Sequence, residues 1–509
     1  MSDFVQIELQ PLGETFAVER GTPLQDVLFA HGVEFPCGGR ARCKGCRVRV
    51  VRGSLPITPE QEQLLTPEEL AAGWRLACCA SAEGNLTLEL GQWEAAILAD
   101  NSVFAFTPQE GLGVAIDIGT TTLVAQLLDL RNAHVLAVRT ALNAQARHWA
   151  DIMSRVGFAL TRPGRELLTA LIRRQVGRLL QELIAAARAS DARLDGIAIV
   201  GNTVMHHLFC GLDVSPLSHY PFEPEQAGLQ VFRASDLGWK LPGDPTVRFL
   251  PCLGSFVGSD ILAGVLATKL DESDELVGLV DLGTNGEIVI GNRRRLLCAS
   301  TAAGPAFEGA RISMGMRAAT GAISAVTAAA GRFRCHVLGN VAPRGICGSG
   351  LVDAVAVGLD LGSIQPSGRL TSDDGTLMLC PPVALTQNDI RELQLAKAAI
   401  AAGLRILLAR WNAEPRHLAR LYLAGAFGNY INRASAQRIG LLSLPLDKVT
   451  PAGNTALLGA KLALFNTRPE DFAYASLCSR AEHISLNTDP RFQDLFVEEM
   501  AFPKRPGLS

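Results

Sequence analysis

The sequence predicts a protein of several domains, in which a small α+β module precedes a duplicated α/β region. A chain of 509 residues exceeds the size of a single hydrophobic core. Short strand patterns, one helix and a loop rich in Gly and Cys occupy the start of the chain. From Gly113 onward, Ala-, Leu- and Gly-rich segments alternate strand and helix patterns, which is typical of α/β folds. We predict a domain over 1–94, a connector over 95–112 and two lobes over about 113–276 and 277–509.

Composition and charge narrow the possible functions. Apolar residues make up 48% and charged residues 19% of the chain, as in ordinary globular proteins. A net charge of −3 creates no overall field that would attract nucleic acid or anionic lipid. The start of the chain lacks a secretory signal, and no run of about twenty apolar residues could cross a membrane. We expect a cytoplasmic protein with no nucleic-acid or membrane partner, whose cysteines serve as thiols or ligands.

The first segment has the pattern of a β-grasp-like module. Two strands are predicted in "FVQIELQ" and "ETFAVER", around the turn "PLG". A helix is expected in "TPLQDVLFAHGV", with Thr22 as its N-cap and Gly32 at its end. Capped helices with acidic first turns are expected in "TPEQEQLLTPEEL".

Three cysteines cluster in the loop "PCGGRARCKGCRVRV". Cys37, Cys43 and Cys46 have the spacing C-x5-C-x2-C, and the next cysteines are Cys78 and Cys79. A [2Fe–2S] cluster requires four thiolates, which a three-plus-one arrangement supplies, whereas a zinc site more often has two C-x2-C pairs. The loop glycines allow backbone N–H groups to approach sulfide. We predict a [2Fe–2S] cluster, with zinc or unrelated thiols as the alternatives.

The cysteine spacing is similar to that of adrenodoxin-like ferredoxins. In ferredoxins of this kind the fourth ligand usually ends the sequence "RLAC", and this resemblance implies Cys78 as the ligand. Cys79 would then be a spectator or a substitute. Basic side chains around the loop form either a solvated face or a docking surface for an acidic electron-transfer partner.

One strand–turn–strand motif occurs twice in the α/β region. "GVAIDIGTTTLVAQLLDL" begins at Gly113 and "VGLVDLGTNGEIVIGN" begins at Val277. Their aspartates, Asp117 and Asp281, are 281 − 117 = 164 positions apart, the size of one α/β subdomain, so we predict a duplicated fold. Glycine at such a turn lets backbone N–H groups approach a phosphate, and the two aspartates would hold Mg²⁺ through its waters. The residues predicted to contact a nucleotide here are Gly119, Thr120, Thr121, Thr122, Gly283, Thr284 and Asn285.

A third motif, "ARLYLAGAFGNYIN", indicates a buried strand that ends in Gly425 and Gly428, before a helix that starts at Asn429. A glycine-rich turn there leaves room for adenosine. With the two hairpins, it resembles the actin, hexokinase and heat-shock-chaperone ATPase superfamily, whose actin-like (ribonuclease H-like) lobes enclose ATP and rotate about a hinge. The resemblance implies that Asp117 and Asp281 are catalytic. Asn202, in "AIVGNT", would orient the attacking water or cap a helix.

Other polar residues have less certain roles. The turn "STAAGPAFEGA" contains Gly304, which we assign to the nucleotide, although the turn could instead line a partner surface. Glu308 suits either a catalytic or a structural carboxylate. His206 and His207 are expected to be core histidines rather than cobalt ligands.

The whole chain resembles the ATP-dependent reductive activators of corrinoid proteins, in which a [2Fe–2S] ferredoxin domain precedes an ATPase of this superfamily. Further stretches that carry the resemblance are "VGNTVMHHLFCGL", "LPCLGSFVGSDILAG", "GICGSGLVDAV" and "LTQNDIRELQLAKAAI". The resemblance implies one-electron reduction of an inactive Co(II) corrinoid protein to Co(I), with a [2Fe–2S] cluster, ATP and Mg²⁺ as cofactors. It also implies two partners, the corrinoid protein and a low-potential electron donor, and it allows a homodimer.

Three other functions remain compatible with these motifs. Activators of radical dehydratases resemble the ATPase, but they usually place one [4Fe–4S] cluster between subunits and lack a ferredoxin module. A non-enzymatic scaffold for corrinoid proteins could use the cluster only to sense redox state. A sugar or acetate kinase would share the ATPase fold, although the N-terminal cysteine motif argues against it.

Overall fold

The N-terminal module forms one mixed sheet with short helices. The computed structural model describes residues 4–10, 14–30, 41, 46–90, 104–147, 149, 151–187, 189, 193–319, 321–466 and 470–504. The elements of the module are β1 (Phe4–Gln10), β2 (Glu14–Glu19), α1 (Leu24–Ala30), β3 (Arg47–Arg52), α2 (Pro59–Leu64), α3 (Pro67–Ala71), β4 (Trp74–Leu76) and β5 (Leu86–Leu90). The strand order is β2-β1-β5-β3-β4, and only β1 and β5 pair in parallel. The predicted β-grasp-like architecture is thus confirmed.

The helix caps of this module follow the prediction at Thr66 but not at Thr22. The Thr66 hydroxyl accepts a hydrogen bond from the amide of Glu69, whose carboxylate accepts one from the Thr66 amide. The Thr22 hydroxyl instead donates to the carbonyl oxygen of Glu19, at 2.6 Å, and α1 begins only at Leu24. The predicted cap at Thr22 is wrong because the end of β2 uses the same hydroxyl.

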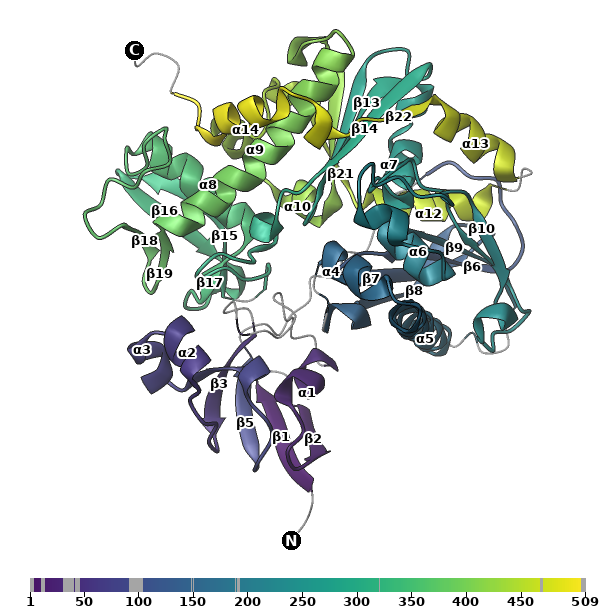
Figure 1. The fold of residues 1–509 in the computed structure, drawn as a ribbon. Helices are drawn as coiled ribbons and strands as arrows, with labels where there is room; N and C mark the ends of the chain where they lie inside the picture. Colours follow the sequence, from purple (N-terminus) through teal and green to yellow (C-terminus); the bar gives the residue numbers. More distant parts are fainter. Residues whose placement is uncertain are drawn as a thin grey trace.

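The remaining described chain alternates strands and helices (Figure 1). Its first half contains β6 (Leu112–Ile118), β7 (Thr122–Asp129), β8 (His134–Leu142), α4 (Ile152–Ala159), α5 (Arg162–Ala186), β9 (Leu194–Gly201), α6 (Thr203–Cys210), β10 (Gln230–Arg233), β11 (Thr246–Phe249) and α7 (Ser259–Thr268). Its second half contains β12 (Val277–Leu282), β13 (Gly286–Asn292), β14 (Arg295–Thr301), β15 (Ala322–Ala329), β16 (Arg332–Val337), β17 (Gly345–Ile346), α8 (Gly348–Asp360), β18 (Thr376–Cys380), β19 (Val383–Thr386), α9 (Gln387–Arg410), β20 (Arg420–Ala424), α10 (Gly425–Tyr430), α11 (Arg433–Arg438), β21 (Val449–Gly453), α12 (Thr455–Phe465), α13 (Glu470–Arg480), β22 (Ala481–His483) and α14 (Phe492–Met500).

Two six-stranded sheets share a topology of five strands and differ in the sixth, which is β10 beside β11 in the first sheet and β22 beside β14 in the second. The first has the order β10-β11-β9-β6-β7-β8 and the second β21-β20-β12-β13-β14-β22. In each, an antiparallel meander of three strands begins with the strand that carries the aspartate, and a parallel strand, β9 or β20, lies beside it. Asp117 pairs with Val200 and Asp281 with Ala424 at equivalent registers. The duplicated fold is therefore confirmed.

The C-terminal part of the chain returns to the first sheet. Helix α12 comes from the stretch assigned to the second lobe, yet it packs against α7, β6 and β9. Its apolar side chains share one core with residues of both sheets, including Ala115 of β6 and Leu279 of β12. Because α12 is apolar nearly all round, it is most stable in such a buried position. Helices α7 and α12 thus form the joint between the lobes (Figure 1).

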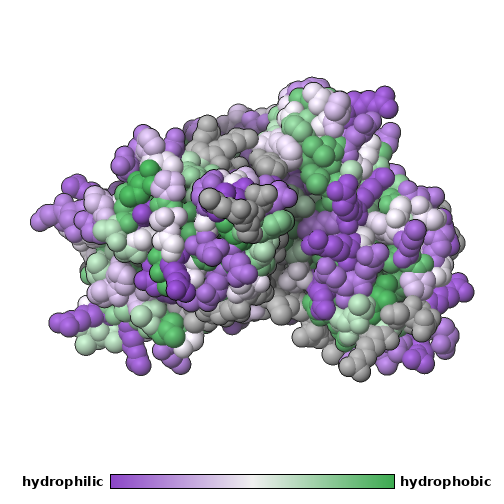
Figure 2. Space-filling view, turned by 90° about the horizontal axis from the view of Figure 1, so that it is seen from below, coloured by the Kyte–Doolittle hydropathy of each residue, from purple (hydrophilic) through white to green (hydrophobic). Residues whose placement is uncertain are grey.

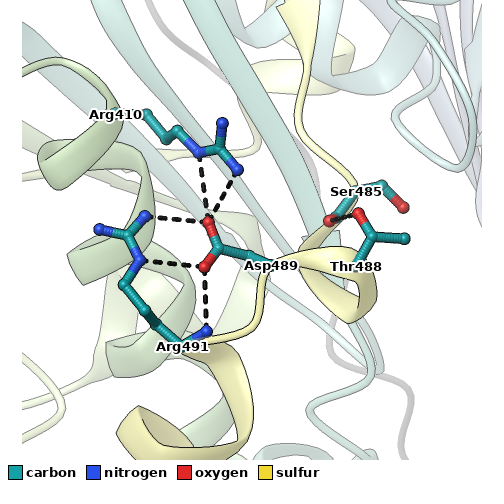
Figure 3. Close-up of polar contacts among 5 residues, drawn as sticks. All are labelled: Arg410, Ser485, Thr488, Asp489 and Arg491. Atoms are coloured by element: carbon teal, nitrogen blue, oxygen red, sulfur yellow. Dashed lines mark hydrogen bonds and ion pairs between the residues drawn. The ribbon is translucent and has the colours of Figure 1, made fainter.

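Ion pairs between the buried Asp489 carboxylate and two half-exposed arginines hold α14 against the end of α9 in the second lobe (Figure 3). The Asp489 carboxylate accepts hydrogen bonds from the guanidinium groups of Arg491 and Arg410, at 2.9–3.2 Å. The hydrogen bonds from Arg491 hold the pKa of Asp489 well below its usual range, and Arg410 adds to this effect. The charge is therefore satisfied within the fold, which indicates a structural role.

On the face that carries the module, the surface formed by the described residues is mostly hydrophilic (Figure 2). Apolar side chains on that face form small separate patches. Among the described residues, no helix has both the length and the apolar character needed to cross a membrane. A groove of about 1000 Å³ along α5 contains five arginines, Arg162, Arg165, Arg173, Arg174 and Arg178. Three of these already pair with carboxylates, so much of the charge of the groove is neutralised.

Candidate functional site

The turn between β6 and β7 is fixed through its carbonyl oxygens. The side-chain amide of Asn143 donates to the Gly119 oxygen (2.9 Å), and its backbone amide donates to the Thr121 oxygen (2.7 Å). The Arg155 guanidinium donates to the Thr120 oxygen (2.6 Å). Asn143 and Arg155 are both completely buried. The interior of the first lobe therefore holds three consecutive peptide units of the turn.

These hydrogen bonds to the carbonyl oxygens also fix the direction of the backbone N–H groups in the turn. In a trans peptide unit the C=O and N–H groups point in opposite directions. Because the carbonyls of Gly119 and Thr120 point into the lobe, the N–H groups of Thr120 and Thr121 point away from it. A Cβ at Gly119 would lie 2.7 Å from the Thr122 oxygen, to which the Gly119 amide donates. The turn therefore needs glycine at its first position, and the N–H groups that face away from the lobe are free of these carbonyl contacts.

The turn between β12 and β13 repeats this arrangement with different partners. The amide of Gly283 donates to the Asn285 oxygen (3.1 Å), and that of Gly304 donates to the Thr284 oxygen (3.0 Å). The Thr284 hydroxyl donates to Glu308 Oε1 (2.9 Å). The sequence analysis assigned Gly304 to the nucleotide site but did not say which hairpin it adjoins. In the structure Gly304 lies against the second hairpin. Glu308 holds the Thr284 hydroxyl, so the structure gives this carboxylate a positioning contact.

Four carboxylates, those of Asp117, Asp260, Asp281 and Glu287, gather near the two hairpins, and burial with the charges of Asp260 and Asp281 raises the pKa of Glu287. Burial, followed by the negative charges of Asp260 and Asp281, raises the pKa of Asp117 well above its ordinary value. Burial raises the pKa of Asp281 to about 6, and burial together with Asp281 raises the pKa of Asp260. The three aspartates nevertheless keep some solvent exposure. When several of these carboxyl groups are ionised, their charges repel one another.

This repulsion suits a hydrated cation. In the part of the chain that the structure describes, no three Asp, Glu, His or Cys side chains are grouped closely enough to bind a metal ion directly. Mg²⁺ in phosphate sites keeps several of its waters and uses one or two carboxylates. Asp117 and Asp281 fit that mode, because a divalent ion bridged by water would offset their mutual repulsion. Asp260, in the first turn of α7, was not predicted as a site residue, although it lies in "LPCLGSFVGSDILAG", one of the stretches that carry the resemblance.

Two Gly-Asn-Thr sequences place asparagines beside the first hairpin. Asn202 caps α6, and its side-chain amide donates to the Thr120 hydroxyl (2.9 Å). Asn454 caps α12, and its hydrogen bond to Asp117 lowers the pKa of that carboxyl, against the larger effect of burial. Asn202 therefore has the predicted capping contact and also reaches the site. Asn454 was missed, although the repetition of Gly-Asn-Thr at 201–203 and 453–455 is a signal that could have identified it.

Strand β20 leads directly into α10, which begins at Gly425 rather than at Asn429. The predicted helix start is wrong because Gly425 itself makes the turn, with φ +81°. A Cβ at this position would lie 2.6 Å from Asp281 Oδ1. At Gly428 a Cβ would lie 3.1 Å from the backbone of Leu423. Both glycines thus permit close backbone approach, and the first of them makes room for the Asp281 carboxylate.

Replacing Gly425 by Ala is expected to weaken ATP binding about tenfold or more, equivalent to about 1.4 kcal/mol. The added methyl group must displace the Asp281 carboxylate. Gly453→Ala is the matched control, because Gly453 also has positive φ (+67°) but a Cβ there meets nothing within 4 Å. Calorimetric titration with Mg·ATP measures both variants. Equal losses of affinity would contradict the role of the Asp281 position, because backbone strain alone would then explain them.

Two predicted cluster ligands lie together in the N-terminal module. Cys46 is buried just before β3, and Cys78 lies in the turn after β4. A hydrogen bond with the Cys46 thiol and burial raise the pKa of the Cys78 thiol far above its ordinary value. The sulfur of Cys79 lies 3.8 Å from that of Cys78, and its thiol also interacts with Thr58. Contact between the buried Cys46 thiol and the partly exposed Cys78 thiol fits a shared iron–sulfur centre, and this contact supports Cys78 over Cys79. Cys37 and Cys43 lie outside the described residues.

The histidines near the site belong to the core of the first lobe, as predicted. His206 and His207 are almost completely buried. The ring of His206 lies edge-on to Phe249, with the centroids 4.9 Å apart. Burial lowers the pKa of His206 to about 3, so its ring stays neutral at physiological pH. These rings pack inside the protein rather than face an incoming cofactor.

Family models match most of the chain. A 2Fe-2S iron–sulfur cluster binding domain matches residues 7–83. A model described as the RACo middle region matches 112–273, and the C-terminal domain of RACo, the ASKHA domain, matches 275–507.

Named relatives match most of the chain. The corrinoid activation enzyme RamQ of Eubacterium limosum is 32% identical over 443 residues, which cover 80% of this chain and 74% of RamQ. The Co(II) methylated amine-specific corrinoid protein reductase of Methanosarcina barkeri is 27% identical over 77% of each chain. The solved structure of a reductive activator for corrinoid, iron–sulfur protein superposes with a TM-score of 0.70, at 26% identity and over 98% of both chains. The chain belongs to the RACo family, whose members join an N-terminal 2Fe-2S domain to an ASKHA ATPase domain.

Proposed function

We propose that this protein is an ATP-dependent enzyme that reduces a corrinoid protein from Co(II) to Co(I) by one electron. The observation that carries the proposal is that one chain combines an iron–sulfur module with an ATPase. A module with cluster ligands contacts both lobes of a duplicated ATPase. Relatives that match 77–80% of the chain are named for corrinoid activation and for Co(II) corrinoid protein reduction.

Cys37, Cys43, Cys46 and Cys78 are the proposed ligands of the [2Fe–2S] cluster, which supplies a one-electron carrier when bound. Clusters in plant-type ferredoxins have potentials near about −400 mV. The resemblance implies that the Co(II)/Co(I) couple is often lower still. Each 100 mV of uphill transfer costs about 2.3 kcal/mol, while a conformational coupling supplies about 1–3 kcal/mol. Nucleotide-dependent docking could therefore offset a deficit of about a hundred millivolts.

The ATPase residues have proposed roles that follow from their positions. The amides of the two hairpin turns would bind phosphate oxygens, with the hydroxyls of Thr121, Thr122 and Thr284 as further donors. Asp117 and Asp281 would hold hydrated Mg²⁺. Asn202 would orient the attacking water from its contact with the first hairpin. ATP then acts on the protein complex rather than as a phosphoryl donor to a substrate.

Formation of Co(I) tests this function. The chain, reconstituted with iron and sulfide, is mixed anaerobically with a Co(II) corrinoid protein and a low-potential reductant. The absorbance of Co(I) is expected to rise several-fold faster with Mg·ATP than without nucleotide, because ATP relieves the thermodynamic deficit. Equal rates and yields with and without ATP would contradict the proposal.

A further inference from the structure

The N-terminal module contacts both lobes through polar side chains. On the first lobe, Gln25 Nε2 donates to the carbonyl oxygen of Arg147 (2.6 Å), and the Arg147 guanidinium pairs with Asp26. On the second lobe, the Arg344 guanidinium pairs with Glu89. In Figure 1 the module accordingly lies below both lobes rather than beside one of them.

The two carboxylates of the module are rigidly spaced. Asp26 lies in α1 and Glu89 lies in β5. Both elements are anchored in the same core, to which they contribute Leu24, Leu28, Leu88 and Leu90. The separation of Asp26 and Glu89 therefore stays constant while the module is folded.

Arg147 is connected to the first nucleotide hairpin by a short rigid path. It ends the 3₁₀ turn Ala144–Arg147, which starts directly after Asn143. Asn143 is the residue that holds the carbonyls of Gly119 and Thr121. Its side-chain oxygen also accepts a hydrogen bond from the amide of Gln145, inside the same turn. Arg147 therefore moves with the first hairpin.

Arg344 is connected to the second hairpin in a similar way. It precedes β17 and the start of α8 at Gly348. A Cβ at Gly348 would lie only 1.8 Å from the Phe307 oxygen, so these backbones are in direct contact. Phe307 is followed by Glu308, which accepts the hydrogen bond from Thr284. Arg344 therefore moves with the wall of the second hairpin.

We infer that Arg147 and Arg344 are positioning residues that place the iron–sulfur module according to the nucleotide bound between the lobes. The inference rests on the proposed ATP-dependent function. The spacing of Asp26 and Glu89 is fixed, whereas the spacing of Arg147 and Arg344 depends on the angle between the lobes. Both ion pairs can form together at only one such angle. A rotation of the lobes on nucleotide binding must break one pair and let the module turn about the other.

Distances between spin labels in the full-length holoprotein test this inference. Labels are introduced through unnatural amino acids at three exposed positions, Val51 of the module, Val231 of the first lobe and Met378 of the second. Pulsed EPR then measures both module–lobe distances and the lobe–lobe distance, with and without a non-hydrolysable ATP analogue. In the wild-type protein we expect narrow module–lobe distributions without nucleotide. With the analogue, the lobe–lobe distance changes and at least one module–lobe distribution broadens or shifts.

Charge-changing variants show whether the two ion pairs set the position of the module, or whether a general loss of stability explains the result. Arg147→Asp is expected to broaden the distance between the module and the first lobe without nucleotide, and the charge swap with Asp26→Arg is expected to restore the narrow distribution. Arg344→Asp is expected to broaden the distance to the second lobe. Arg162→Asp is the control, since it makes the same charge change in an exposed ion pair of α5.

Two results would contradict this inference and leave the proposed ATP-dependent function intact. One is wild-type distances in both Arg147→Asp and Arg344→Asp, and the other is a nucleotide-dependent lobe–lobe distance with both module–lobe distances unchanged. A lobe–lobe distance that does not respond to the analogue, in a protein that fails to retain nucleotide, would reject the proposed ATP function and the inference with it.

Discussion

Serine in place of Cys78 is expected to leave the protein almost without cluster and to abolish Co(I) formation, whereas serine in place of Cys79 leaves both close to wild type. The two residues are neighbours in one turn and undergo the same change, so they control for each other. Only the Cys78 thiol hydrogen-bonds with Cys46, while that of Cys79 interacts with Thr58. Loss of a thiolate ligand should lower the iron content by about tenfold or more.

Iron and sulfide analysis and visible absorbance after anaerobic reconstitution measure this difference. An intact cluster in Cys78→Ser together with a lost cluster in Cys79→Ser would reverse the ligand assignment. A colourless wild-type protein after reconstitution would contradict the [2Fe–2S] site altogether.

Asparagine in place of Asp117 is expected to slow ATP-dependent Co(I) formation by about a hundredfold or more, because the carboxylate proposed to hold hydrated Mg²⁺ near the phosphates is lost. The same change should stabilise the nucleotide-free protein by about 1–2 kcal/mol. A carboxyl whose pKa is raised in the folded state destabilises the fold when ionised. This cost is present above the raised pKa and falls away as the pH drops toward the ordinary value of about 3.9. The variant should therefore show a smaller gain of stability between pH 8 and pH 5 than the wild type does.

Asp129→Asn provides the opposite case on the same hairpin. Hydrogen bonds from Arg131 lower the pKa of Asp129, so removal of this charge should weaken the fold near neutral pH while ATP-dependent activity persists. Urea unfolding at several pH values and Co(I) assays measure both variants. A destabilised Asp117→Asn protein, or one with full ATP dependence, would contradict the proposed role of the carboxylate group.

The fold could be predicted from the sequence because its signals are local and repeated. The two aspartate hairpins share strand, turn and strand patterns, and their topology is also shared. Residues next to the turns, such as Gly119 and Thr284, follow directly from the motif. The glycine-rich third motif placed Gly425 correctly beside the site but misplaced the start of α10. Gly425 and Gly428 were interpreted as a loop that precedes the helix. In the structure the positive φ of Gly425 completes the turn within one residue, so α10 begins at Gly425 itself.

The rest of the site depends on contacts between distant segments. Asp260 enters the site from the first turn of α7, in a stretch that carried the family resemblance without pointing to a role for this residue, and Asn454 enters because α12 returns to the first sheet. The contacts of the module depend on Arg147 and Arg344, which are ordinary surface residues in the sequence. Nothing in their neighbourhood indicates that the tertiary fold brings them to the same module. Such residues become visible only when the sheets and their connections are in place.

The most direct test of the account is a single-turnover experiment without external reductant. Protein whose cluster has been reduced by one electron is freed of excess reductant and mixed with a Co(II) corrinoid protein. The account predicts that, with Mg·ATP, the EPR signal of the reduced cluster is lost and Co(I) absorbance appears in an equal amount, whereas without nucleotide little of either change occurs. Equal transfer in both samples, or Co(I) formation without oxidation of the cluster, would contradict it.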